Sequence, residues 1–361
     1  MNTTVAQALA DFGQSIWLDN LSRSLIESGK LQELVSSGVR GVTSNPTIFD
    51  KAISQSSDYD DKIKALAKSG KSSWEIYDDL TVSDVQEAAD IFRPVYDKTR
   101  GLDGYVSLEV NPRLAHFAPE TIAEARRLHK KVGRPNLMLK VPATEAGFAA
   151  IEELLAQGLN VNATLIFSLG QYSRTAVAYI RGLKRLAVNN GDLSRVRSVA
   201  SVFISRLDTA CDALLSDESA ALRGKAAVAN SALIYQQAVQ IFSGNEFQSL
   251  KSSGANIQRP LWASTGTKNP AYSDIKYVAE LMARDTVNTM PDKTLEAFLK
   301  NGQVKEALTR DAQGAADIVS GFKKTGIEIE AVCEKLQKEG ITQFENSFDS
   351  LLKSIESKIK S

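Results

Sequence analysis

Residues 137–167 read LMLKVPATEAGFAAIEELLAQGLNVNATLIF and decide the fold. Two short runs rich in aliphatic residues, 137–142 and 161–167, have the length and composition of β-strands. The segment between them places large apolar side chains on one face of a helix, at Phe148, Ile151, Leu154 and Leu155. A strand, a helix and a second strand in that order predict two parallel strands joined by a crossover helix.

Six further strand-like runs extend this rhythm along the chain: residues 16–19, 41–46, 105–110, 198–205, 260–265 and 286–290. Eight strands separated by helical segments predict the α/β class and, within it, a (β/α)8 TIM barrel with extra helices and a C-terminal helical tail. We expect a single domain over residues 1–361, because no low-complexity linker or Pro-rich break interrupts the pattern. Helical insertions are expected at about 56–100 and 207–253, and C-terminal helices at about 293–361.

The tail carries an apolar stripe with residues three or four positions apart: Phe344, Phe348, Leu351, Leu352, Ile355 and Ile359. We interpret the stripe first as a surface that packs against the barrel wall. A lid or an oligomer contact is the alternative, and a homodimer would be compatible with it.

The composition excludes several classes of protein. Lys plus Arg number 43 and Asp plus Glu number 43, so no net charge favours nucleic acid or an anionic membrane as a partner. No run approaches the roughly 20 apolar residues of a membrane span, and the first residues do not read as a secretion signal, so we expect a cytoplasmic protein. Two cysteines and two histidines are too few for a disulfide framework or a zinc site. We therefore expect no metal and no cofactor, and chemistry by Lys, Asp, Glu, Asn, Thr and Ser.

Side-chain alternation predicts which residues enter the barrel. In the runs 105–110, 137–142 and 161–167 one face is apolar and the other carries polar residues near the end of the strand. The outward face of a barrel strand packs on helices, so the polar face should point inward. The residues expected to converge are Glu109, Lys140, Asn162 and Thr164. The same count turns Trp17, Asp19, Thr43 and Asn45 inward in the first two strands.

Lys140 is the candidate nucleophile. Attack on a carbonyl needs the free amine, whereas a lysine in water is protonated, with a pKa of about 10.4. Burial in the barrel disfavours the cation and so supplies the amine. The alternative is an inert lysine that reaches solvent from the end of its strand.

Six motifs together resemble the transaldolase family, in its longer bacterial branch: VTSNPT (42–47), SLEVN (107–111), LKVPAT (139–144), NVNATLIFS (160–168), SVFISRLD (201–208) and WASTGTKN (262–269). The resemblance implies metal-free transfer of a dihydroxyacetone unit in the pentose phosphate pathway. The donor would be a ketose phosphate, sedoheptulose 7-phosphate or fructose 6-phosphate. The acceptor would be an aldose phosphate, glyceraldehyde 3-phosphate or erythrose 4-phosphate.

The resemblance also implies roles for the catalytic residues. Lys140 would form the Schiff base, and Asp19 would take the proton from the C4 hydroxyl during cleavage and return it to the acceptor. The alternative for Asp19 is a helix cap or a turn. Glu109 and Thr164 would hold the water that shuttles protons during imine formation. A plain salt bridge between Glu109 and Lys140 is the competing interpretation.

Substrate binding is expected from residues at the strand ends: Thr43, Asn45, Asn162, Ser201, Phe203, Arg206, Ser264 and Lys268. By resemblance, Asn45, Asn162 and Ser201 would bond the hydroxyls of the three-carbon unit, although polar termination of a strand also explains them, Ser201 above all. The guanidinium of Arg206 suits a phosphate, and Ser264 and Lys268 would complete that pocket. Lys268 lies in a loop that departs from the better-known branch of the family, so a solvated surface lysine is its alternative.

Two other functions compete with transfer. A fructose-6-phosphate aldolase shares the lysine and the barrel but releases free dihydroxyacetone. Such relatives typically carry a tyrosine where this chain has Phe203, which lacks the hydroxyl that would help to protonate the intermediate. A non-catalytic sugar-phosphate-binding barrel is the second rival, and it would require the loss of Lys140 or its proton-transfer partners.

Overall fold

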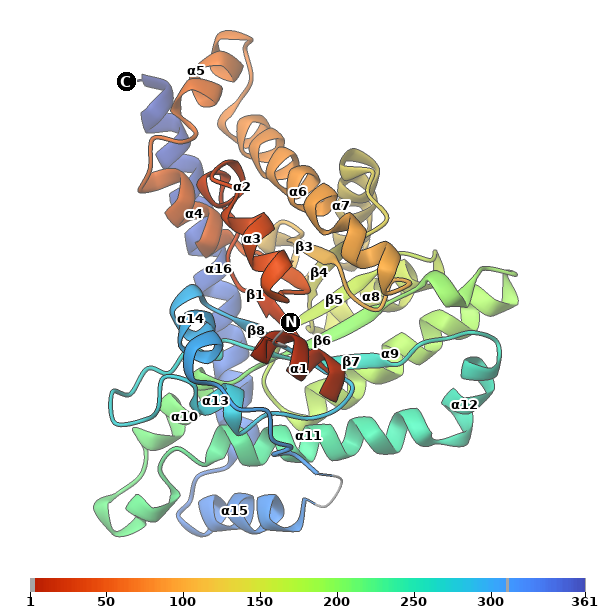
Figure 1. Cartoon of the computed structure of the whole chain (residues 1–361), viewed down its shortest axis with the longest axis vertical. Helices are drawn as coiled ribbons and strands as arrows, with labels where there is room; N and C mark the ends of the chain where they lie inside the picture. Colours follow the sequence, from red (N-terminus) through yellow and green to blue (C-terminus); the bar gives the residue numbers. More distant parts are fainter. Residues whose placement is uncertain (1–3, 310–311, 361) are drawn as a thin grey trace.

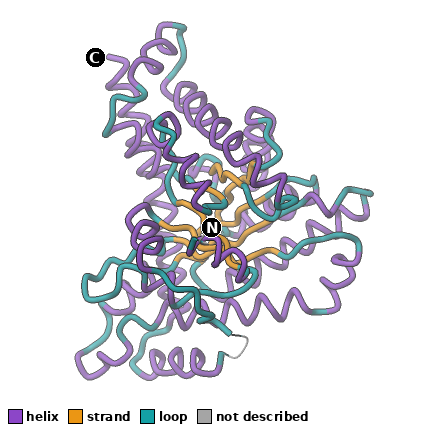
Figure 2. Tube along the Cα trace, viewed as in Figure 1, coloured by secondary structure: helices purple, strands orange, loops and turns teal. Residues whose placement is uncertain are grey.

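The computed structural model describes residues 4–309 and 312–360, and its centre is a closed barrel of eight parallel strands. These are β1 (Gln14–Leu18), β2 (Gly41–Thr43), β3 (Tyr105–Glu109), β4 (Leu137–Pro142), β5 (Val161–Ile166), β6 (Ser198–Phe203), β7 (Gln258–Ala263) and β8 (Thr286–Met290). Each strand pairs with the next one, and β8 pairs with β1. Figure 2 shows the strands in orange at the centre, with helices around them. The predicted TIM barrel is confirmed.

Two predicted strands end earlier than expected because their last polar residues start helices. Asn45 caps α4 (Pro46–Ser54), and its side chain accepts a hydrogen bond from the backbone N–H of Ile48. Ser205 is the first residue of α10 (Ser205–Asp212). Other strands differ by one or two residues at an end: 16–19 is observed at 14–18, 105–110 at 105–109, 161–167 at 161–166 and 260–265 at 258–263.

The other helices follow in chain order: α1 (Val5–Phe12), α2 (Arg23–Glu27), α3 (Lys30–Ser37), α5 (Asp60–Lys68), α6 (Ser73–Lys98), α7 (Ala118–Val132), α8 (Glu145–Ala156), α9 (Leu169–Val188), α11 (Ala226–Ser243), α12 (Asn245–Ser252), α13 (Lys276–Ala279), α14 (Asp292–Asn301), α15 (Gln313–Lys324) and α16 (Ile329–Lys360). The segment 56–100 contains α5 and α6, and 207–253 contains α11 and α12. Within the described part of the chain, no helix is both long and apolar enough to cross a membrane.

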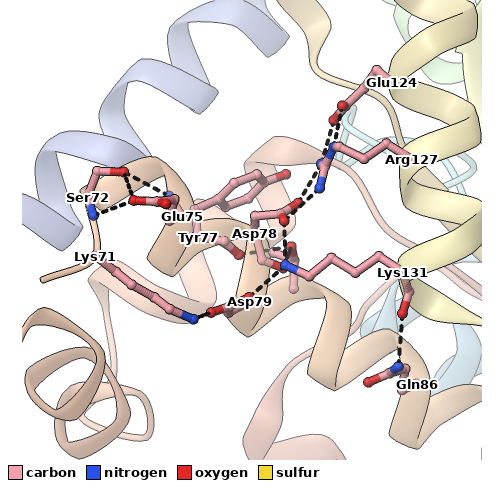
Figure 3. Close-up of polar contacts among 11 residues, drawn as sticks. Lys71, Ser72, Glu75, Tyr77, Asp78, Asp79, Gln86, Glu124, Arg127 and Lys131 are labelled. Carbon is pink, nitrogen blue, oxygen red and sulfur yellow. Dashed lines mark hydrogen bonds and ion pairs between the residues drawn. The ribbon is translucent and has the colours of Figure 1, made fainter. Parts of the chain in front are cut away.

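Helix α6 is joined to α7 by a network of ion pairs, drawn in Figure 3. The carboxylate of Asp78, which is buried, accepts hydrogen bonds from the guanidinium of Arg127, at 2.6 and 2.8 Å, and from Lys131, at 2.5 Å. Lys131 also bonds Asp79, which pairs with Lys71 at the start of the helix. Helix α6 lies in the connection between β2 and β3 and packs against β3 and α7, so these contacts fix it within the helical layer of the barrel.

Helix α16 crosses the end of the barrel where the strands finish. The side-chain amide of Gln337 donates to the carbonyl oxygens of Ala143 and Leu165, both at 2.9 Å, just beyond β4 and within β5. The helix then runs along α4 towards α5, as the blue ribbon in Figure 1 shows. Four members of the predicted stripe are buried by these contacts, namely Phe344, Phe348, Leu351 and Ile355. The stripe therefore packs inside the chain, and part of it lies over the barrel mouth.

The opposite end of the barrel interior, where the strands begin, is filled around a buried ion pair. Arg259 on β7 lies 3.2 Å from Asp103, the carboxylate that precedes β3. The hydroxyl of Ser15 donates to the same carboxylate at 2.7 Å, and the indole N–H of Trp17 lies 3.4 Å from it. All four side chains are buried, so they form the floor of the barrel rather than a surface feature.

Candidate active site

A cavity of about 310 Å³ opens where the strands end, beneath α16. Its walls come from the ends of β1, β2, β4, β6, β7 and β8, together with α4, α10 and α16. Nine of the twelve residues predicted from sequence line it: Asp19, Thr43, Asn45, Lys140, Ser201, Phe203, Arg206, Ser264 and Lys268. The other three, Glu109, Asn162 and Thr164, are buried within the barrel. A larger hollow of about 480 Å³ near the starts of β7 and β8 contains none of the twelve.

Lys140 lies at the bottom of this cavity. It sits on β4 opposite Glu109 of β3, because the register pairs these two residues. Its side chain is 4% exposed, and its Nζ donates to the carbonyl oxygen of Ser44 at 3.2 Å. The ring centroid of Phe344, from α16, lies 5.8 Å from the same nitrogen. The amine therefore faces a cavity that the ring of Phe344 covers from the side of α16.

Glu109 is an incompletely satisfied partner for this lysine. Its Oε2 lies 3.5 Å from Lys140 Nζ, a long ion pair, and neither carboxylate oxygen has a hydrogen-bond partner among the described residues. Burial raises the pKa of Glu109 to about 7, although the positive charge of Lys140 opposes the shift. The hydroxyl of Thr164 is also buried and unpaired. These oxygens retain hydrogen-bonding capacity that a reacting group can use.

Asp19 follows β1 and faces the cavity from the other side. Its Oδ1 accepts a hydrogen bond of 2.7 Å from the hydroxyl of Thr43. Burial raises the pKa of the Asp19 carboxyl, while Lys140 and the hydrogen bond from Thr43 act in the opposite direction. Asp19 is not the cap of the next helix, because the side chain of Ser22 caps α2. The carboxyl is therefore available to the cavity.

Amides and hydroxyls lie at the bottom and along the walls of this site. The hydroxyl of Ser201 donates to Asn162 Oδ1 at 2.6 Å, and Asn162 Nδ2 donates to Ser107 Oγ at 3.1 Å. Asn45 uses its carbonyl oxygen to cap α4, which leaves its NH2 group for a ligand. Such groups are suited to the hydroxyls of a sugar.

Positive charge gathers at the mouth of the cavity. Arg206 is half-buried on α10, with its guanidinium carbon 5.6 Å from the Phe203 ring centroid, and it forms no salt bridge within residues 4–309 and 312–360. Ser264 has φ of 56° and lies 3.1 Å, oxygen to oxygen, from Ser205. Lys268 and Lys51 also line this cavity. An unpaired guanidinium beside hydroxyls and ammonium groups can bind a phosphate.

Sequence reasoning missed several lining residues, among them Lys51, Thr289, Gln343 and Phe344. Thr289 had a signal, because it is a polar residue near the end of the last strand. Gln343 and Phe344 had none in the strand pattern, since α16 brings them from the far end of the chain. Across the described ranges, no group of three or more His, Cys, Asp or Glu is placed to hold a metal ion.

Comparison with known proteins gives a consistent result. The family described as Transaldolase/Fructose-6-phosphate aldolase matches residues 16–355. The chain is 48% identical to "Transaldolase 2" of Streptomyces coelicolor, over 99% of this chain and 98% of that protein. It is 47% identical to "Transaldolase" of Saccharopolyspora erythraea, over 97% and 96%. It is 43% identical to "Transaldolase 2" of Nostoc punctiforme, over 100% and 99%.

Proposed function

Because the chain belongs to the transaldolase/fructose-6-phosphate aldolase family, we propose that it is a transaldolase that moves a dihydroxyacetone unit between sugar phosphates. The donor is sedoheptulose 7-phosphate or fructose 6-phosphate, and the acceptor is glyceraldehyde 3-phosphate or erythrose 4-phosphate, in the pentose phosphate pathway. One observation carries the proposal: a buried lysine, Lys140, shares one cavity with Asp19 and lies 3.5 Å from the buried carboxylate of Glu109.

The first step is formation of an imine at Lys140. The free amine attacks the C2 carbonyl of the ketose, and loss of water from the carbinolamine leaves a protonated imine. Protons must move to and from this centre, and the carboxylate of Glu109, whose oxygens are unpaired, lies 3.5 Å from Lys140 Nζ. Thr164, whose hydroxyl is also unpaired, lies on the neighbouring strand β5. With a pKa of about 7, Glu109 can both accept and return a proton near neutral pH.

The second step breaks the bond between C3 and C4. Asp19 takes the proton of the C4 hydroxyl, the electron pair of the C3–C4 bond flows into the imine, and the aldose phosphate leaves. The three-carbon unit remains on Lys140 as an enamine, which attacks the aldehyde of the acceptor in the reverse sequence. Asn45, Asn162 and Ser201 hold the hydroxyls of the unit, and Thr43 holds Asp19.

The phosphate is assigned to Arg206, Ser264 and Lys268 at the mouth of the cavity. This places the charged end of the sugar farthest from Lys140, which leaves C2 near the amine. The wall residue Phe203 has no hydroxyl, which favours a lasting enamine and therefore transfer over release of dihydroxyacetone. A cytoplasmic location, a homodimer and the single-domain organisation stay predictions from the sequence.

The test is intact mass after incubation of the protein with fructose 6-phosphate and borohydride, followed by peptide mapping. A reduced three-carbon adduct on the peptide with Lys140 is the expected result, and Lys51→Met, which removes another lysine of the same cavity, should keep it. Absence of an adduct from the folded protein would favour a non-catalytic sugar-phosphate-binding barrel. An adduct accompanied by free dihydroxyacetone, with no transfer to an aldose phosphate, would favour the aldolase.

A further inference from the structure

Thr289 belongs to the wall behind Asp19. It lies on β8, beside Trp17 of β1 in the register of the barrel, and it is 1% exposed. Its hydroxyl oxygen is 2.7 Å from that of Thr43, and its carbonyl oxygen accepts a hydrogen bond of 3.0 Å from the hydroxyl of Thr265. Both the side chain and the backbone of Thr289 are therefore fixed.

The direction of the hydrogen bonds follows from counting protons. The hydroxyl of Thr43 has one proton, and it donates that proton to Asp19 Oδ1 at 2.7 Å. The bond between the two threonines must therefore be donated by Thr289. Among the described residues, the hydroxyl of Thr289 has no other partner. The row Thr289, Thr43, Asp19 thus points every proton towards the carboxylate, and each bond strengthens the next.

We propose that Thr289 is a positioning residue for the reaction, which acts through Thr43 to hold Asp19 ionised and aimed at the C4 hydroxyl of the substrate. The inference rests on the proposed function, because it needs Asp19 to exchange that proton. If Asp19 were protonated and donated to Thr43, the row would reverse. The proton of Thr289 would then have no acceptor, so the row favours the carboxylate form.

The charges around Asp19 act on the same equilibrium. Lys140 and Lys268 favour the carboxylate, Asp292 disfavours it, and Arg206 interacts favourably with it. Thr289 differs from all four because it is neutral and does not need to touch the sugar. Its removal should therefore change the proton transfer more than the binding of substrate.

The variant that tests this is Thr289→Val, which removes the hydroxyl and keeps the shape of a β-branched side chain. We expect kcat to fall about tenfold with KM changed less than about twofold, because one hydrogen bond in the row to a charged group is lost. The acid limb of the pH profile of kcat should move to higher pH, since Asp19 loses support for its carboxylate. Thr289→Ser should restore both quantities.

A matched control is Thr286→Val. Thr286 is a buried threonine on the same strand, at the opposite end of the barrel, where its hydroxyl donates to the carbonyl of Ala283 and accepts from Gln14. It should lower stability without moving the acid limb. If Thr289→Val does not fold, Thr289→Ala removes the same hydroxyl without forcing a second methyl group into the barrel.

A second measurement separates this inference from the proposed function. Borohydride trapping with dihydroxyacetone reports imine formation at Lys140, a step in which Asp19 need not take part, so wild type and Thr289→Val should be labelled equally. An unlabelled wild type would overturn the proposed function and the inference with it. Normal labelling would overturn the inference alone if Thr289→Val kept its kcat and acid limb, or if Thr289→Ser behaved like valine.

Discussion

The barrel interior contains two buried ion pairs, one at each end, and they differ in how completely their hydrogen bonds are made. At the floor, the Asp103 carboxylate pairs with Arg259 and also accepts from Ser15. The Arg259 guanidinium donates in addition to the carbonyl oxygens of Leu102 and Thr286. At the end where the strands finish, the Lys140 side chain lies 3.5 Å from a Glu109 carboxylate whose oxygens have no other protein partner among the described residues.

We propose that this difference separates a structural pair from a catalytic one. A buried charge is expensive unless its hydrogen bonds are satisfied, and the Arg259 pair satisfies nearly all of them. The Lys140 pair leaves oxygens unpaired, which costs stability but leaves hydrogen-bonding capacity for the reaction. In a TIM barrel the chemistry occupies the end where the strands finish and the other end supports the fold, and the proposed roles of the two pairs agree with that division.

The sharpest way to test the division is to remove Lys140. Lys140→Met should lower kcat by about 10⁴-fold or more, because Lys140 is the buried lysine of the cavity, whereas Lys51 and Lys268 are exposed at its mouth. Release of glyceraldehyde 3-phosphate from fructose 6-phosphate, with erythrose 4-phosphate present as the acceptor, measures this loss. The same variant leaves Glu109 buried without its cation, but this carboxyl has a raised pKa of about 7 that Lys140 had opposed, so it can take up a proton, and the loss of stability in urea should be smaller than that of Asp103→Ala. Turnover near the wild-type rate would remove the central role of Lys140.

At the floor the expected effect is on stability instead. Asp103→Ala should lower the free energy of unfolding by about 3–5 kcal/mol, because the Arg259 charge stays buried without its partner. Urea unfolding at neutral pH measures the loss, and kcat of the protein that remains folded should change little. The double variant Asp103→Leu, Arg259→Met should recover much of the stability. A loss below about 1 kcal/mol in the single variant would mean that the hydrogen bonds of the Asp103–Arg259 pair are no better satisfied than those of the Lys140–Glu109 pair.

Glu109→Gln tests the Lys140–Glu109 pair without removing the lysine nucleophile. We expect kcat to fall about 10²- to 10³-fold, because the amide cannot accept the protons that imine formation releases. In wild type the acid side of the profile should contain two ionisations, that of Asp19 and that of Glu109 near pH 7, and Glu109→Gln should lose only the one near pH 7. An ionisation near pH 7 that persists in Glu109→Gln would have to come from another group.

The raised pKa of Glu109 also predicts the direction in which the stability of the fold changes with pH. The folded protein holds the proton more tightly than the unfolded chain, whose carboxyl has the ordinary value of 4.5. Stability that is present below pH 4.5 is therefore lost as the pH rises towards about 7. Glu109→Gln, which cannot ionise, should become more stable relative to wild type over that interval. The comparison uses urea unfolding of both proteins at each pH.

Much of the fold could be predicted because each strand carries its own alternation and each crossover helix its own apolar face. The ends of the strands could not, since Asn45 and Ser205 are polar residues that could continue a strand end and instead start helices. The inward positions of Glu109, Lys140 and Asn162 followed from the alternation of side chains alone, because residues on the face opposite the apolar, helix-packed face of a barrel strand point into the barrel.

The rest of the site depends on contacts that no local pattern encodes. The apolar stripe indicated that α16 packs, but nothing in its spacing indicated that Phe344 would lie 5.8 Å from the Lys140 amine. Likewise the floor pair joins Asp103, just before β3, to Arg259 on β7, and the two residues meet only when the barrel closes. Such pairings are fixed by topology, so the sequence of either partner alone does not reveal them.

The smallest expected effect concerns Arg206, a charge that belongs to neither pair. It is half-buried and forms no salt bridge within the described ranges, so it should bind an anion of the substrate rather than support the fold. Arg206→Ala should raise KM for fructose 6-phosphate about 10- to 100-fold, since charge-assisted bonds to the phosphate are lost, and should leave borohydride trapping with dihydroxyacetone unchanged.

Two further variants sharpen this prediction. Arg206→Lys keeps the charge without the bidentate geometry, so its KM should lie between that of wild type and that of Arg206→Ala. Arg195→Ala, at an 84% exposed side chain, is the matched control and should match wild type. If Arg206→Ala left KM unchanged while lowering stability by several kcal/mol, Arg206 would join the structural group with Arg259, and the phosphate would have to bind at Lys51 or Lys268.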